Sequence, residues 1–229
     1  MIEVLDHGFV RLIECWGHGC TDDTDFEVGI IEAARQSTQG AFRGWEKDYR
    51  LLKYLYDNKH STPFEFAGMV IEVRAPLFVF REWHRHRTQS YNEMSARYSQ
   101  LPPLWYLPTV DRLMLDGGKN KQADTIDGAI DLTAEGAENY IERLDKDCSH
   151  FSEQYSQDLR LGVPKEIARL GMPVGWYSQM RAQANLRNWL GFLTLRMDPA
   201  AQWEIRQFAN AVGEIIGAKF PRTWRLFCD

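Results

Sequence analysis

The sequence has few of the features that define several large protein classes. Its only cysteines are Cys15, Cys20, Cys148 and Cys228, and their spacing forms no disulfide framework, so a reducing, cytoplasmic location is expected. No run of about eighteen apolar residues is present, so the sequence predicts no transmembrane helix. The early acidic residues do not match a signal peptide, and no membrane partner is expected.

Several catalytic signatures are also missing. There is no GxGxxG pattern after a strand, no Walker A loop, and no serine or cysteine in a nucleophile signature. Cys15, His18 and Cys20 lie close together in the sequence, but no second ligand pair follows at the spacing of a zinc finger, so no metal site is predicted. An enzyme with this sequence would rely on a bound cofactor for the bond-making chemistry, and its side chains would bind and orient the reactants.

Basic residues are outnumbered in the whole chain but are concentrated in one stretch. The chain has 27 Lys and Arg against 32 Asp and Glu, a net charge of −5, which opposes a general nucleic-acid binder. Residues 81–98, REWHRHRTQSYNEMSARY, nevertheless carry four arginines and two histidines. Guanidinium groups pair with phosphate oxygens, so this stretch predicts a site for a phosphorylated small molecule. An arginine-rich surface helix and loop is the plainer alternative.

The hydrophobic pattern predicts an α+β fold, with a small, mostly antiparallel sheet packed against long helices. Residues 1–229 are expected to form one domain with a helical insertion at about residues 119–161, where Ile126, Ile130 and Leu132 fit a helical spacing. The predicted strands cover residues 4–15, 66–73 and 176–184, and the predicted helices cover 24–37, 45–57, 163–170 and 185–196, with further helices beginning at Pro76 and Pro199.

Three further groups of polar residues are typical of sites, although each has a plainer explanation. They are His60 with Glu65 around a turn, Glu166 with Arg169, and Asn185 with Arg187 and Arg196 along one helix. An i,i+3 salt bridge would explain the second group. Helix capping and the helix dipole would explain Asn185 and Arg196 in the third.

One motif resembles a known family. RHRTQSYNEMSARY, residues 85–98, follows the pattern RHRxxSxNExSxRY of the flavin-dependent thymidylate synthases. The agreement extends over most of the chain, through the segments AARQS (33–37), HSTPFE (60–65), EIARLGMP (166–173) and NLRNWLGFLTLR (185–196). The sequence is identified on these segments as a member of that family.

The resemblance implies an activity and an assembly. It implies an α+β homotetramer whose active sites are shared between subunits, with FAD as cofactor, NADPH as reductant and methylenetetrahydrofolate as one-carbon donor. The substrate would be a uridylate nucleotide that is methylated at C5. The family uses no cysteine nucleophile, which agrees with the missing nucleophile signature.

The resemblance also implies residue roles by position. Arg196 resembles the catalytic arginine that polarises the uracil ring at N3, where a guanidinium would stabilise developing negative charge rather than act as a base. The residues that resemble cofactor contacts are Ser37, His60, Thr62, Arg85, His86, Arg87, Glu93, Asn185, Arg187 and Gly191. The residues that resemble substrate contacts are Glu82, Trp83, His84, Arg85, Glu93, Met94, Ser95, Ala96, Arg97, Arg169 and Arg196.

The sequence departs from the family pattern at Glu82, Phe66 and Gly191. Glu82 stands where relatives usually have a glutamine, and Gly191 where they usually have histidine or asparagine. A carboxylate beside an anionic nucleotide costs binding unless it accepts from an arginine or a hydroxyl, and a ribose 2′-OH would suit it. The hypothesis is therefore a specialised relative that accepts UMP as well as, or instead of, dUMP, similar to the uridylate methylases of polyoxin-type antibiotic pathways.

Three other interpretations compete with this hypothesis. The first is a strict dUMP-specific thymidylate synthase of primary metabolism, in which Glu82 and Gly191 are neutral changes. The second is a non-catalytic flavin or nucleotide sensor, for which Gly191 would be the gap in the chemistry. The third is an RNA-binding protein with aromatics among arginines, which the acidic pI of about 5.7 opposes.

Overall fold

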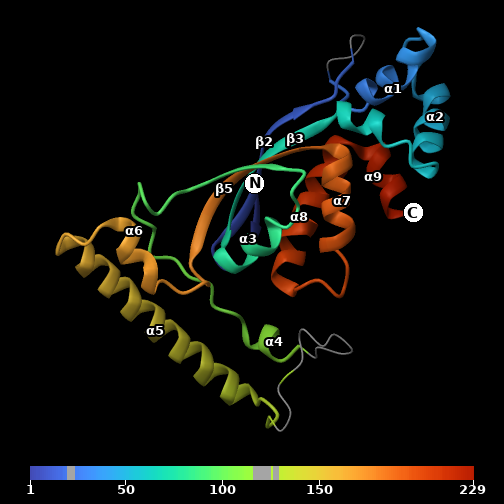
Figure 1. Ribbon diagram of the computed structural model, residues 1–229. Helices are drawn as coiled ribbons and strands as arrows, with labels where there is room; N and C mark the ends of the chain where they lie inside the picture. The colour runs from blue at the N-terminus through green and yellow to red at the C-terminus, as the bar shows by residue number, and fades with distance from the viewer. Residues whose placement is uncertain (20–23, 116–124, 126–128) are drawn as a thin grey trace.

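A five-stranded antiparallel sheet forms the centre of the molecule and confirms the predicted α+β class (Figure 1). The computed structural model describes residues 1–19, 24–115, 125 and 129–229. The strands are ordered β1-β2-β3-β5-β4. Their bounds are Ile2–Val4 for β1, Gly8–Trp16 for β2, Gly68–Pro76 for β3, Ser90–Glu93 for β4 and Tyr177–Asn185 for β5.

The register of the sheet separates an apolar face from a polar one. Ile71 of β3 pairs with Leu12 of β2 and Ala182 of β5, and these side chains point toward the helices. The next residue of β3, Glu72, lies on the other face, where its carboxylate accepts from Arg11 and lies 3.6 Å from Arg181. Strand side chains alternate between faces, so one face of the sheet is available to build a core.

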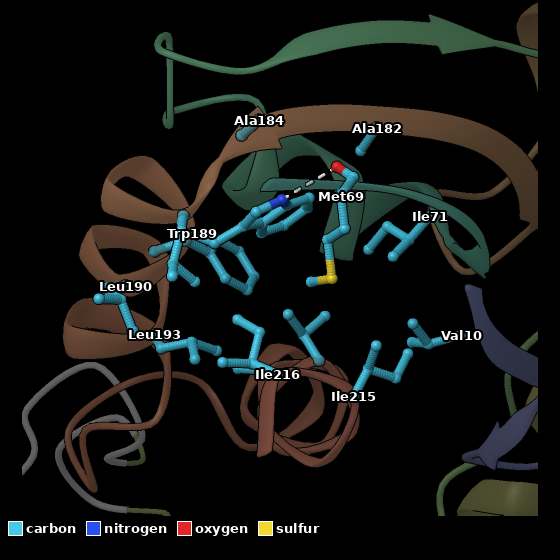
Figure 2. Close-up of a cluster of buried hydrophobic side chains, with 14 of the residues drawn as sticks. Val10, Met69, Ile71, Ala182, Ala184, Trp189, Leu190, Leu193, Ile215 and Ile216 are labelled. Atoms are coloured by element: carbon cyan, nitrogen blue, oxygen red, sulfur yellow. Dashed lines mark hydrogen bonds between the residues drawn. The ribbon is translucent and has the colours of Figure 1, made fainter. Parts of the chain in front are cut away.

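Helices cover the apolar face. They are α3 (Leu77–Trp83), α7 (Leu186–Arg196) and α8 (Trp203–Lys219), with α9 (Pro221–Cys228), α1 (Val28–Arg35) and α2 (Trp45–Asp57) at one end. Figure 2 shows Ile215 and Ile216 of α8 facing the sheet, with Ile215 on the side of Val10 and Ile71 and Ile216 on the side of Leu193 and Trp189. The indole N–H of buried Trp189 donates to the carbonyl of Met69 at 3.2 Å, so its polar atom is satisfied inside the core.

A second helical layer lies away from this core. The long helix α5 (Ala134–Arg160) projects past the sheet together with α4 (Val110–Leu113) and α6 (Lys165–Ala168) (Figure 1). Thr133 caps α5 by accepting from the Gly136 N–H at 3.1 Å. In the described part of the chain, no helix is both long and apolar enough to cross a bilayer.

Several predicted elements differ from the observed ones. The helix expected from residue 24 begins at Val28. The last long helix begins at Trp203 rather than at Pro199. The carboxylate of Asp198 accepts from the Ala200 N–H at 2.7 Å and holds the residues before this helix in a turn. Ile130 and Leu132 precede α5 and are exposed, because the helix starts only after its Thr133 cap. The sequence did not predict β4 or α9.

Some predictions fall on residues outside the described part of the chain. Cys20, Ile126 and the start of the predicted insertion lie there. Among the described residues, no three potential metal ligands gather into a group. The single-domain prediction with an insertion at about 119–161 stays a prediction.

Removal of core volume from the sheet tests this packing. Ile71→Ala is expected to lower the free energy of unfolding by about 2–5 kcal/mol, because Ile71 is fully buried between sheet and helices. The matched control is Ile130→Ala at a side chain that is 92% exposed, where the change should stay within about 0.5 kcal/mol. Urea unfolding of both variants measures the contrast, and equal losses would contradict the described core.

Candidate active site

The guanidinium of Arg196 joins two segments of chain that are far apart in the sequence. It lies at the C-terminal end of α7, where the sequence placed it. Its Nε donates to Nε2 of His86 at 2.9 Å, one terminal nitrogen donates to the Glu82 carboxylate at 2.8 Å, and the other donates to the Glu82 carbonyl at 3.0 Å. The structure therefore brings together three of the predicted site residues.

This arrangement determines the charge state of His86. Partial burial, followed by the positive charge of Arg196, lowers the pKa of His86 from 6.5 to about 4. The imidazole is thus neutral near pH 7. Because an arginine N–H can only donate, Nε2 must carry the lone pair and the proton must sit on Nδ1.

The loop that carries His86 is held to the core on several sides. The Tyr91 hydroxyl donates to the His86 carbonyl at 2.6 Å, and the Asn188 amide donates to the Thr88 carbonyl at 3.0 Å. Sequence analysis did not assign these two residues to the site. Tyr91 lies within the motif and Asn188 within the helix segment that matches the family. The positions of these two residues in the sequence do not indicate that their side chains hold the loop.

Aromatic rings support the same loop from behind. Phe192 lies edge-on to the His86 ring at 4.9 Å and stacks on Trp83 at 4.5 Å. Trp83 is fully buried and its indole N–H donates to Gln89 at 3.1 Å. The Trp83 side chain, predicted to contact substrate, is thus buried in the core, and its substrate contact stays a prediction.

Two arginines of the motif lie on the surface. Arg85 and Arg87 are exposed and make no ion pair with any described residue. Arg187 of α7, by contrast, pairs with the Glu65 carboxylate from the predicted turn. Asn185 caps α7, as predicted, by accepting from the Asn188 N–H at 2.9 Å. These cations surround the start of α7 and the motif loop with positive charge.

Open space lies beside this group. A hollow of about 260 Å³ separates α2 from α7 and is lined by Leu55, Tyr56, Lys59, Ser61, Phe64, Arg187 and Leu190. On the same helix, a Cβ added to Gly191 would meet nothing within 4 Å. The hollow therefore lies beside Arg187, and the exposed surface at Gly191 carries no side chain.

A second group of predicted residues lies at the other end of the sheet. Arg97 donates to Glu166 at 3.0 Å, and Lys165 donates to the Tyr98 carbonyl at 2.8 Å. Glu166 therefore pairs with Arg97, so the alternative of a local Glu166–Arg169 salt bridge is wrong. Arg169 follows on the same short turn and makes no ion pair with a described residue.

The two arginine groups do not converge in the described chain. Figure 1 shows α6, which carries the Arg97 partner Glu166, well apart from α7, which ends at Arg196. The physical reason is that each group is tied to its own helix, Arg97 to α6 through Glu166 and Arg196 to α3 through Glu82. The described chain therefore holds two separate arginine groups, each with a carboxylate partner.

The remaining predicted residues occupy three settings. Ser37, His60 and Thr62 are exposed near α1 and α2, with the His60 ring edge-on to Tyr54 at 5.6 Å. Glu93 and Met94 line a hollow of about 360 Å³ at the end of β4. His84 stacks on Phe80, Ser95 accepts from the Arg97 N–H, and Ala96 is buried.

Comparison with known proteins identifies the family of the chain. The family model described as thymidylate synthase complementing protein, Thy1, matches residues 20–222. The flavin-dependent thymidylate synthase of Thermotoga neapolitana is 35% identical over 226 residues, covering 99% of this chain and 93% of that protein. The enzyme of the same name from Thermus thermophilus is 38% identical over 226 residues, covering 99% and 77%.

A solved structure has the same fold. The UMP/dUMP methylase PolB from Streptomyces cacaoi, bound with 5-Br dUMP, matches with a TM-score of 0.83 and 29% identity, covering 99% of this chain and 97% of that one. The relatives and the solved structure identify the chain as a methyltransferase. The chain belongs to the flavin-dependent thymidylate synthase family, which confirms the identification made from its motif.

The lowered pKa of His86 predicts a pH dependence of stability. Between pH 6.5 and about 4 the unfolded chain protonates this histidine while the folded chain does not. Its contribution to the free energy of unfolding is therefore complete above pH 6.5 and decreases as pH falls toward 4. Urea unfolding of the wild type and of His86→Gln across this range isolates the effect. The stability difference between them should decrease toward pH 4, and a pH-independent difference would contradict the assignment.

Proposed function

We propose that this enzyme methylates C5 of a uridylate nucleotide by a reductive reaction, with FAD as cofactor, NADPH as reductant and methylenetetrahydrofolate as carbon donor. The observation that carries the proposal is the anchored Arg196, whose partners Glu82 and His86 lie in or beside the family motif. The names of the relatives support uridylate methylation, since they are thymidylate synthases and a UMP/dUMP methylase.

Arg196 can recognise the uracil edge and stabilise charge on it. A guanidinium has five N–H donors, and the three hydrogen bonds to Glu82 and His86 leave one free N–H on each terminal nitrogen. These two N–H groups would donate to the C4=O of a uracil, and to N3 as negative charge develops on that edge during substitution at C5. Because the group is already held in place, little reorganisation is needed when that charge appears.

The residues around the start of α7 fit a flavin dinucleotide. Arg85 and Arg87 are exposed cations without ion-pair partners among the described residues and would bind its phosphates. Arg187, Asn185 and the open space at Gly191 would accommodate the remainder. When bound and reduced, the flavin supplies the electrons for the reaction; the protein binds, orients and excludes water.

The Arg97 group would bind the nucleotide phosphate. Arg97 and Arg169 stand at the α6 end of the sheet, apart from Arg196 of the same subunit (Figure 1). A nucleotide that uses both groups would have to lie between subunits, which favours a homotetramer with shared active sites.

Glu82 bears on the choice of sugar. One of its carboxylate oxygens accepts from Arg196, and no hydrogen bond from a described residue reaches the other. That oxygen would accept from a ribose 2′-OH, so we propose that UMP is a substrate alongside dUMP. PolB, named a UMP/dUMP methylase, supports this choice; the curated relatives, named thymidylate synthases, favour the strict dUMP alternative.

The sensor alternative rests on the missing side chain at Gly191. A sensor would bind flavin without using it. Anaerobic addition of NADPH to the yellow protein separates the two functions: the proposed enzyme loses its flavin absorbance, and a sensor keeps it.

The role of Arg196 predicts the behaviour of Arg196→Lys. Lysine keeps the charge but loses the planar fork and the Nε donor to His86. Turnover should fall by about a hundredfold or more while the bound flavin is retained. Absorbance of the purified variant and its product formation measure the two properties, and loss of the flavin would contradict the assignment of Arg196 to the nucleotide.

The role of Glu82 predicts a change in sugar preference. In Glu82→Gln the charged acceptor becomes neutral, so the ratio of kcat/KM for UMP to that for dUMP should fall about three- to tenfold. Glu166→Gln is the matched control, since it makes the same change beside Arg97 and should leave the ratio unaltered. Wild-type turnover of dUMP alone would refute the proposal for UMP.

A further inference from the structure

The orientation of the Arg196 guanidinium depends on a residue that the sequence assigned to the cofactor. His86 was expected to contact flavin, yet its Nε2 is occupied by the Nε–H of Arg196 at 2.9 Å. Glu82 alone contacts only the terminal nitrogens of the guanidinium. The third contact, on the Nε side, comes from His86.

We propose that His86 is a positioning residue that holds Arg196 in its working orientation and, as the Nδ1–H tautomer, offers its second ring nitrogen as a donor to a bound ligand. This inference rests on the proposed function, in which Arg196 faces the uracil. His86 would thereby link the nucleotide side of the site, through Nε2, to the ligand on its other side, through Nδ1–H.

The surroundings of His86 suit this role. Its carbonyl is held by the Tyr91 hydroxyl at 2.6 Å, and its ring lies edge-on to Phe192 at 4.9 Å. Phe192 stands four residues before Arg196 on α7, so one helix carries both the guanidinium and the ring that packs against its acceptor. Loop and helix are in this way fixed to each other at both ends of the His86–Arg196 hydrogen bond.

The tautomer follows from the donor inventory. Arg196 has no acceptor atom, so the hydrogen bond requires an unprotonated Nε2, and the single proton of the neutral ring lies on Nδ1. No hydrogen bond from the described residues reaches Nδ1. A ligand group that meets this nitrogen must therefore be an acceptor, such as a ring carbonyl.

Nucleotide binding measured in a double-mutant cycle tests the positioning role, because binding can be read even where turnover is lost. His86→Leu should weaken nucleotide binding about tenfold in the wild-type background but less than about twofold in Arg196→Lys, which lacks the Nε donor. His86→Gln, whose side-chain carbonyl still accepts, should recover affinity to within about threefold of the wild type. Equal losses from His86→Leu in both backgrounds would overturn the proposal.

The tautomer gives a second readout that is independent of activity. Nitrogen NMR of protein with isotopically labelled histidine distinguishes Nδ1–H from Nε2–H, and His86→Gln identifies the signal. The wild type should show Nδ1–H for His86, and Arg196→Lys should shift it toward Nε2–H. An Nε2–H ring in the wild type, or no change in the variant, would refute the inference whether or not the enzyme methylates uridylate.

Discussion

The hydrogen bonds of the Arg196 guanidinium connect the parts of the structure that form the site. They tie the end of α7 to the end of α3 and to the motif loop, through Glu82 and His86. A half-buried cation is costly unless its donors are paired, and here the carboxylate of Glu82 neutralises it while the histidine stays uncharged. The rest of the fold positions these three side chains on a buried base of Trp83 and Phe192.

The core holds Trp83 and Phe192 in place, because both side chains are fully buried in it. β3, β5 and α7 are continuous in space, since β5 leads directly into α7 at Asn185, and Trp189 of α7 bonds back to Met69 of β3. Arg196 is thus the last residue of a helix whose start and middle are both fixed to the sheet. Arg85 and Arg87, the residues proposed to bind the cofactor, lie on the exposed loop, where no described carboxylate pairs with them.

Much of the fold could be predicted from local patterns. The helix over residues 45–57 and the Asn185 cap were correct, because amphipathic spacing and capping chemistry are local. Strand β4 was missed because its four residues lie in a polar motif and are extended only by pairing with β5. The Glu82–Arg196 pair spans more than a hundred residues and follows from tertiary packing, and the split between the Arg97 and Arg196 groups has no signal in a linear motif.

The most direct test of the account is a crystal structure of this protein with a bromouridylate bound. The account predicts a guanidinium nitrogen of Arg196 within about 3 Å of the uracil N3–C4=O edge, with the Glu82 and His86 contacts retained and the phosphate on Arg97 and Arg169 of a neighbouring subunit. A nucleotide bound away from Arg196, or an Arg196 that leaves both partners to reach it, would contradict the central claim.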